Sequence, residues 1–135
     1  MQSESLKPGL EAQVSETVTD SNTASAWGSG GLPVYATPAM IALMEKAAFA
    51  AVAPHLPAGW STVGTEVNVR HLSATPRGMN VTARAKLLGV DGRALHFSVE
   101  AHDDLGKIGE GLHSRFIIEE EKFMSKTEGR AKNSE

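Results

Sequence analysis

Glu45 is the residue whose place in the sequence points most clearly to chemistry. It lies in the longest apolar stretch of the chain, residues 40–52, whose composition predicts a helix that is hydrophobic on nearly all sides. Its helical neighbours at three and four residues' distance cannot bond a carboxylate; they are Ile41, Ala42, Ala48 and Phe49. A carboxylate buried there needs a distant partner, or its pKa rises, and both outcomes are common in active sites. Lys46 has equally apolar neighbours, so either residue could be the one that faces water.

His71 and Thr37 could supply the proton transfer and the hydroxyl that a reactive carboxylate needs. His71 ends an alternating segment, residues 61–71, and four residues share its parity: Val63, Thr65, Val67 and Val69. An imidazole beside a buried carboxylate forms a general acid–base pair, and the alternative is a core histidine or one exposed at a strand end. Thr37 precedes Pro38 at the predicted helix start, so its hydroxyl either caps the helix or points towards a substrate carbonyl.

The remaining candidate groups are weaker. His113 and Arg115 share the outer parity of the last predicted strand, where a solvated pair is the simplest interpretation, although Arg115 could bind a phosphate or carboxylate. The five histidines of the chain lack close metal-ligand spacing, so no metal site is expected. The chain has no Gly-x-Ser-x-Gly motif, which gives no support to a serine hydrolase of that type.

The order of elements predicts how these groups are positioned. A weakly alternating strand at residues 10–18 precedes a glycine-rich loop at 19–32, which lacks the features of a phosphate-binding loop. A helix at 38–53 follows, and then four strands, of which the last covers residues 107–120 with Ile108, Leu112, Phe116 and Ile118 on one side. An antiparallel sheet with one apolar face must cover that face, so we expect an α+β fold whose sheet wraps around the helix.

Composition limits the classes of function. The 135 residues favour one domain, residues 9–123, between a disordered tail at 1–8 and a polar C-terminal tail at 124–135. A formal net charge of −3 disfavours nucleic acid as a partner, and no apolar run is long enough to span a bilayer. The absence of cysteine and the polar N-terminus fit a soluble cytoplasmic protein.

Three motifs contain most of the candidate residues: YATPAMIALME at residues 35–45, VGTEVNVRHLSATP at 63–76 and GLHSR at 111–115. Together they resemble the fluoroacetyl-CoA thioesterase family of hot-dog-fold proteins. The resemblance covers roughly residues 8–123 and implies an antiparallel sheet of five or six strands around one long central helix. It implies an acyl-CoA thioesterase that needs no cofactor beyond the coenzyme A of its substrate, and a homodimer, possibly a tetramer, with active sites near the subunit interface. Its implied catalytic residues are Thr37, Glu45 and His71, and it places Gly64 and Arg115 around the substrate.

The sequence departs from this family at one position and leaves the chemistry open. Gly31 stands where the fluoroacetyl-specific member has an aromatic lid, so we expect another acyl group or looser specificity. Glu45 could attack the thioester carbonyl or activate a water molecule, with His71 moving protons. Two alternatives are a hot-dog hydratase acting on an enoyl thioester and a non-catalytic acyl-CoA binding module.

Overall fold

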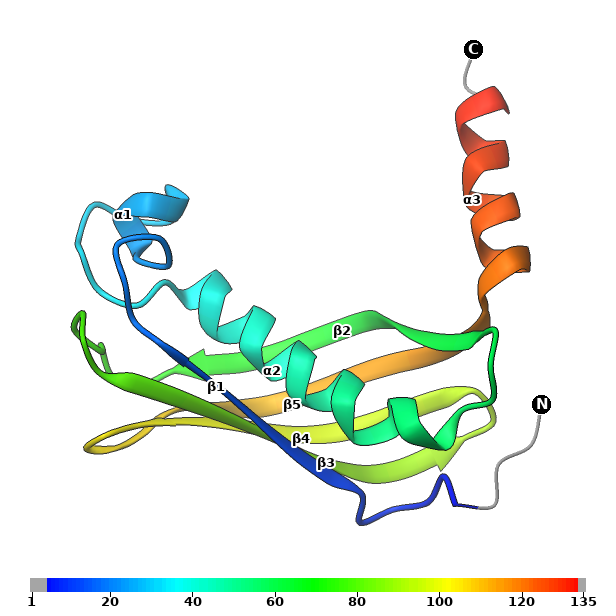
Figure 1. Cartoon of the computed structure of the whole chain (residues 1–135), viewed down its shortest axis with the longest axis horizontal. Helices are drawn as coiled ribbons and strands as arrows, with labels where there is room; N and C mark the ends of the chain where they lie inside the picture. The colour runs from blue at the N-terminus through cyan, green and yellow to red at the C-terminus, as the bar shows by residue number, and fades with distance from the viewer. Residues whose placement is uncertain (1–4, 134–135) are drawn as a thin grey trace.

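The computed structural model describes residues 5–133, which form one curved antiparallel sheet and a helix that lies on its concave face (Figure 1). The sheet has five strands in the order β1-β3-β4-β5-β2, so β1 and β2 are its edges. Their bounds are Glu11–Thr17 for β1, Trp60–His71 for β2, Asn80–Asp91 for β3, Ala94–Asp103 for β4 and Gly106–Glu119 for β5. Each predicted strand is present, and the α+β prediction is confirmed.

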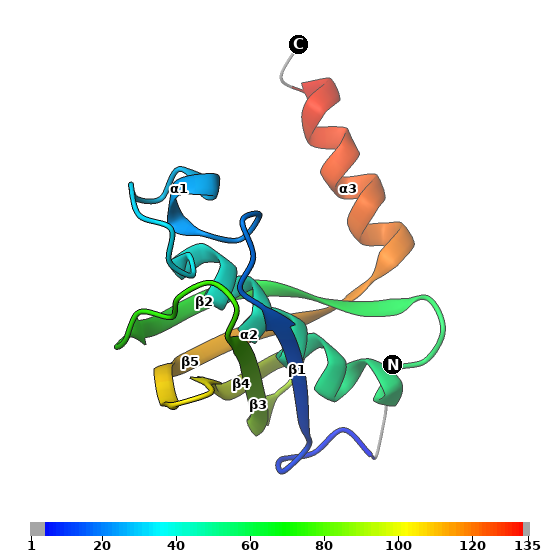
Figure 2. The ribbon, with the colours of Figure 1, turned by 60° about the vertical axis from the view of Figure 1, so that its left-hand side comes forward.

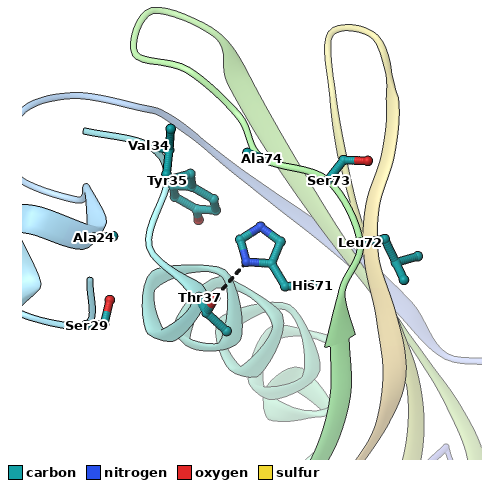
Figure 3. A pocket seen from close by; sticks show the side chains of 9 residues that line it. All are labelled: Ala24, Ser29, Val34, Tyr35, Thr37, His71, Leu72, Ser73 and Ala74. Carbon is teal, nitrogen blue, oxygen red and sulfur yellow. Dashed lines mark hydrogen bonds between the residues drawn. The ribbon is translucent and has the colours of Figure 1, made fainter. Parts of the chain in front are cut away.

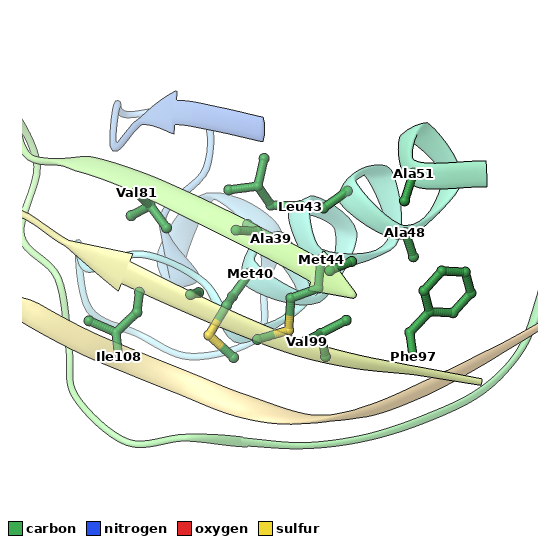
Figure 4. Close-up of a cluster of buried hydrophobic side chains, with 14 of the residues drawn as sticks. Ala39, Met40, Leu43, Met44, Ala48, Ala51, Val81, Phe97, Val99 and Ile108 are labelled. Carbon is green, nitrogen blue, oxygen red and sulfur yellow. The ribbon is translucent and has the colours of Figure 1, made fainter. Parts of the chain in front are cut away.

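The central helix α2, Thr37–Val52, packs mainly against β1 and β3 and follows the predicted span within one residue. Its inner side is fully buried and interdigitates with side chains from β3 and β4, including Val81, Phe97 and Val99 (Figure 4). Pro38 occupies the first turn, where its missing N–H costs no hydrogen bond. The capping role considered for Thr37 is wrong, because Ala36 is the N-cap and Thr37 is already helical. The Thr37 hydroxyl is therefore available to bond another group.

A β-bulge in β2 changes which of its residues face the helix. Gly64 pairs with Arg115 and Glu66 pairs with Ser114, so Thr65 is the extra residue. Before the bulge the even-numbered residues Thr62 and Gly64 face the helix. After it the odd-numbered residues face the helix, beginning with Val67. The expectation that residues 63–71 present one uniform face is therefore wrong for the part of β2 before the bulge.

A second bulge reverses the predicted faces of β5. Ala101 pairs with Gly109 and His102 pairs with Lys107, which leaves Ile108 as the extra residue. Ile108 is buried, but beyond the bulge the buried positions are His113, Arg115 and Ile117, whereas Leu112 and Phe116 are exposed on the outer face. The predicted apolar face of β5 was wrong because a strict two-residue period was counted through the bulge.

Two further helices lie outside the predicted elements. The four-residue α1, Ala24–Trp27, interrupts the glycine-rich loop and lies beside the N-terminus of α2. The polar C-terminal segment is not an irregular tail: it forms α3, Glu120–Asn133, which projects away from the sheet (Figure 2). Acidic residues in its first turn and basic residues in its last turn complement the helix dipole.

Of the predicted N-terminal tail, residues 1–4 lie outside the described residues. No helix within residues 5–133 is long and apolar enough to cross a membrane.

Candidate active site

Thr37 and His71 form the first part of the candidate site. Thr37 lies in the first turn of α2 and His71 is the last residue of β2, and the Thr37 Oγ1 is 2.7 Å from the His71 Nδ1 (Figure 3). The other ring nitrogen, Nε2, is buried and has no hydrogen-bond partner among the described residues. A buried polar atom without a partner costs free energy in the folded state, and such atoms are frequent where a substrate or water binds.

A cavity of about 280 Å³ opens beside this pair. Its walls come from α1 and the loop after it, from the start of α2 and from the segment that follows β2; the residues are Ala24, Ser29, Val34, Tyr35, Thr37, His71, Leu72, Ser73 and Ala74. The Tyr35 hydroxyl donates a hydrogen bond to the Glu16 carboxylate at 2.5 Å, and burial raises the Tyr35 pKa further above its usual range. Tyr35 therefore stays protonated, which leaves His71 as the titratable group of this cavity near neutral pH.

Burial lowers the pKa of His71 below 6.5, and the nearby Ser73 backbone opposes that shift because it favours the protonated ring. The imidazole is consequently neutral at pH 7 and one of its nitrogens has a free lone pair. With Nδ1 held by a hydroxyl, the ring is oriented so that Nε2 faces the cavity. This arrangement suits a general base.

Glu45, Arg115 and Gly64 form the second part of the site. The Glu45 Oε2 is 3.7 Å from the Arg115 Nη1, and both residues line a cavity of about 320 Å³ together with Ala42, Lys46 and Phe49. The Glu45 side chain is 41% exposed, so the prediction of a buried carboxylate is wrong for the isolated chain. The physical reason is position on the helix: Glu45 faces the open edge of the sheet at β2 instead of its covered centre.

Arg115 is buried, although the sequence placed it on the outer face of its strand. Its Nε donates to the Thr62 Oγ1 at 2.8 Å and its Nη2 donates to the Thr62 carbonyl at 3.0 Å. Its guanidinium also lies over the Phe49 ring, 5.8 Å from the ring centre. These contacts fix the guanidinium and leave Nη1 directed towards Glu45.

His113 is a buried member of this cluster that the sequence interpretation missed. It was assigned to solvent with Arg115, yet its side chain lies between β2 and Arg115 and its ring stacks on Phe97 at 6.1 Å. The signal that could have found it was the pair Gly109 and Gly111, because a Cβ at either position would meet atoms of α2 or β2 closer than real contacts allow. Glycines required by close packing mark the inner face of β5, and His113 and Arg115 share their parity.

Gly64 lets the carboxylate approach the strand. A Cβ at this position would lie 3.1 Å from the Glu45 Oε2 and 3.4 Å from the Arg115 Nη1. The nearest atom belongs to the end of a flexible side chain, so it can give way by a few tenths of an ångström. Gly64 thus determines where the carboxylate rests.

Gly64→Ala is expected to displace the Glu45 carboxylate and to lower kcat by about 3- to 30-fold for any reaction in which that carboxylate takes part, because small misplacements of a reacting group are costly. The melting temperature should change little, since the crowded atoms are side-chain ends. Steady-state kinetics and thermal unfolding measure both effects. Gly89→Ala is the matched control, because a Cβ at Gly89 meets nothing within 4 Å. Unchanged kcat in Gly64→Ala would contradict this role.

The two parts of the site are separate within one chain. Thr37 and Glu45 are eight residues apart on α2, a rise of about 12 Å along the helix axis. The structure therefore brings Thr37 to His71, and Glu45 to Gly64 and Arg115, but it does not bring His71 to Glu45. Among the described residues, no group of three or more His, Asp or Glu side chains could hold a metal ion.

Several known proteins that are similar to this chain in sequence and fold are named as thioesterases. The family described as fluoroacetyl-CoA-specific thioesterase matches residues 18–121. A fluoroacetyl-CoA thioesterase of Streptantibioticus cattleyicolor is 46% identical over 93 residues, which are 69% of this chain and 67% of that protein. A phenylalanine-to-alanine mutant of the fluoroacetyl-CoA-specific thioesterase, solved with fluoroacetate and CoA, has a TM-score of 0.82 at 36% identity and covers 87% of this chain and 99% of its own.

A thioesterase superfamily member from Thermus thermophilus is also similar, with a TM-score of 0.89 at 30% identity over 96% of each chain. The similarity thus extends over nearly the whole described structure, including both parts of the site. The chain belongs to the fluoroacetyl-CoA-specific thioesterase family, and it is a thioester hydrolase with the hot-dog fold.

Proposed function

We propose that this protein hydrolyses a small acyl-CoA thioester, with Thr37, Glu45 and His71 as catalytic residues and with Gly64 and Arg115 beside the substrate. The observation that supports this most is an oriented, neutral His71 ring whose Nε2 has no partner among the described residues. The Glu45 carboxylate, held near the fixed Arg115 guanidinium, is the second supporting observation. The relative solved with both fluoroacetate and CoA supports CoA as the carrier of the acyl group.

A homodimer formed through β2 would unite the two parts of the site. β2 is an edge strand of 12 residues, and residues 64–68 are all exposed. A long exposed edge with free backbone N–H and C=O groups favours pairing with another strand, and a two-fold axis makes that pairing antiparallel between identical copies. Continuation of the sheet across this edge would place the two α2 helices on the same face.

The register of such a dimer decides which groups meet. A two-fold axis between Val67 and Asn68 of β2 would set His71 of the partner subunit opposite Gly64, one strand spacing of roughly 4.8 Å away. Gly64 lies directly beside the Glu45 carboxylate. Each active site would therefore combine Glu45, Gly64 and Arg115 of one subunit with Thr37 and His71 of the other, and the dimer would shield the half-exposed carboxylate from water.

The chemistry then follows from these positions. Glu45 either attacks the thioester carbonyl to form a mixed anhydride, which water hydrolyses, or takes a proton from a water molecule that attacks. In both routes the CoA thiolate leaves, and His71 accepts and returns the protons. The Thr37 hydroxyl and the N-terminus of α2 orient the carbonyl and stabilise the negative charge that develops on its oxygen. No other cofactor takes part in this scheme.

The acyl group is proposed to differ from fluoroacetate or to be less strictly selected. A Cβ at Gly31 would meet nothing within 4 Å, so the loop before α2 places no bulky side chain there. Family membership favours hydrolysis over the enoyl hydratase and binding-module alternatives. A cytoplasmic location and a tetrameric state stay predictions.

Release of free CoA thiol from a panel of short, branched and aromatic acyl-CoAs tests the proposal. We expect turnover on at least one small acyl-CoA, with fluoroacetyl-CoA preferred less strongly than by an enzyme with an aromatic lid. A hydratase would instead consume an enoyl-CoA without releasing thiol. Binding of acyl-CoA without thiol release across the panel would overturn the proposed function.

The pH dependence of kcat/KM provides a separate test of His71. Because burial lowers its pKa, the imidazole stays neutral down to pH values below 6.5 and becomes protonated only in more acidic solution. A protonated ring cannot accept a proton, so kcat/KM should fall on the acidic side with a midpoint below 6.5. A midpoint clearly above 6.5, or one that persists unchanged in His71→Gln, would contradict the assignment.

A further inference from the structure

His113 makes two hydrogen bonds that together determine its protonation state. Its Nδ1 lies 2.7 Å from the backbone carbonyl oxygen of Glu66, and its Nε2 lies 3.2 Å from the Arg115 Nη1. A carbonyl can only accept a hydrogen bond and a guanidinium can only donate one. His113 must therefore be neutral, with its proton on Nδ1 and a lone pair on Nε2 that accepts from Arg115.

The bulge in β2 lies beside this contact. Thr65 is the unpaired residue of the bulge, and Glu66 follows it directly. Here the Glu66 carbonyl accepts a side-chain hydrogen bond from the ring of His113. The β-bulge that changes which residues of β2 face inward thus lies next to the backbone carbonyl that orients His113.

We propose that His113 is a positioning residue: as a neutral acceptor it holds Arg115, which in turn holds Glu45 in the geometry needed for hydrolysis. His113 does not touch the cavity beside Glu45, whose walls include Arg115 but not His113. Its action on the carboxylate therefore passes through the guanidinium. This inference rests on the proposed function of Glu45, but its geometric part can be tested without substrate.

Four groups surround the ring of His113, and their effects on its protonation differ. They are Arg115 on the same strand, Phe97 on β4, the Glu66 carbonyl on β2 and Glu45 on α2. Burial lowers the pKa of His113 and so does the charge of Arg115, whereas the bond to Glu66 and the charge of Glu45 oppose these shifts. If the ring were protonated, Nε2 would become a donor facing a donor, and Arg115 would lose the bond at Nη1, the nitrogen nearest Glu45, while its bonds to Thr62 remain.

Two substitutions of His113 distinguish the bond that Nε2 accepts from Arg115 from the bond that Nδ1 donates to Glu66. Glutamine carries its polar group at the position of Nε2 and can still accept from Arg115, whereas asparagine carries its polar group at the position of Nδ1 and can bond only Glu66. We expect His113→Asn to lower kcat by about 10- to 100-fold with little change in KM, and His113→Gln to retain most of the wild-type kcat. His96→Asn, at an exposed histidine on the outer face of β4, is the control and should match the wild type.

Nitrogen NMR of the histidine rings tests the geometry independently of activity. We expect His113 to show the Nδ1–H tautomer and to titrate below pH 6.5. Titration near 6.5, an Nε2–H tautomer, or equal kcat values for the asparagine and glutamine variants at matched melting temperatures would overturn the proposal. If the wild-type protein released no thiol from any acyl-CoA, the proposed function would fail, while the NMR result would still decide the state of His113.

Discussion

Replacing Glu45 with glutamine is expected to lower kcat for thioester hydrolysis by about 1,000-fold, the largest effect of any single substitution in this chain. Glutamine keeps the size of the side chain but can neither attack a carbonyl nor accept a proton from water. Both mechanistic routes therefore lose their reacting group. Thiol release under saturating acyl-CoA measures the change, and Glu128→Gln, an exposed carboxylate on α3, is the matched control.

The stability of Glu45→Gln should stay close to that of the wild type. The carboxylate is 41% exposed and lies 3.7 Å from the Arg115 Nη1, so the ion pair is partly screened by water and contributes little to folding. A large loss of kcat with an unchanged melting temperature would therefore report chemistry and not misfolding. Wild-type turnover by Glu45→Gln on every acyl-CoA of the panel would exclude the carboxylate from the mechanism.

Labelled water tests whether Glu45 acts as the nucleophile. In a single turnover in ¹⁸O water, attack by the carboxylate makes a mixed anhydride. If water then attacks the acyl carbon, the label enters the acid product; if it attacks the glutamyl carbon, the label enters Glu45. Label in Glu45 therefore establishes the anhydride route. Label found only in the product in the first turnover would exclude attack of water on the glutamyl carbon; it is the result expected both for water activated by Glu45 and for an anhydride opened at the acyl carbon.

Mixed dimers of Glu45→Gln and His71→Ala subunits are expected to recover activity that neither variant has alone. If each site takes Glu45 from one subunit and His71 from the other, the mixed dimer contains one site with both residues intact and one with both replaced. Its kcat per dimer should be about half that of the wild type. Each homodimeric variant should be impaired by about 100-fold or more, since each loses an acid–base group at both sites.

Coexpression with two different affinity tags allows the mixed dimer to be isolated and assayed. If both residues of a site came from the same subunit, every site in the mixed dimer would carry one substitution and activity would stay at the level of the parents. That result would disprove the composite site. A monomer in solution, measured by light scattering, would disprove dimerisation through β2. The mixture of Glu45→Gln with Gly89→Ala subunits is the control for subunit exchange, because it leaves one intact site in either arrangement.

Local sequence patterns predicted the elements well. The apolar run with Pro38 before it and prolines after it limited α2 to within one residue at each end, because helix boundaries depend on nearby residues. The alternation of residues 81–87 and 95–101 predicted the buried faces of β3 and β4 correctly, since the extra residue of the bulge between these strands is Leu88, which lies beyond residues 81–87 and not within β4. The motifs at residues 35–45, 63–76 and 111–115 were sufficient to identify the family.

Such patterns could not predict which residues of β2 and β5 face the helix. An extra residue at Thr65 or Ile108 has no local signature, because a bulge is stabilised by the partner strand and by what packs against it. Each bulge exchanges inward and outward positions along the rest of its strand. His113 and Arg115 were therefore assigned to solvent, although both are buried. They bond each other, and Arg115 contacts the Glu45 carboxylate.

By itself the sequence determined the type and order of the elements, the family, and the three side chains proposed for catalysis, because these depend on residue identity and short-range spacing. Only the tertiary structure decided that His71 pairs with Thr37, that Glu45 pairs with Arg115, and that these pairs lie apart along α2. It also revealed that Glu45 is half-exposed towards an open sheet edge. Burial and hydrogen bonding between distant segments arise from how strands pair and where bulges shift them, and no local pattern encodes those distances.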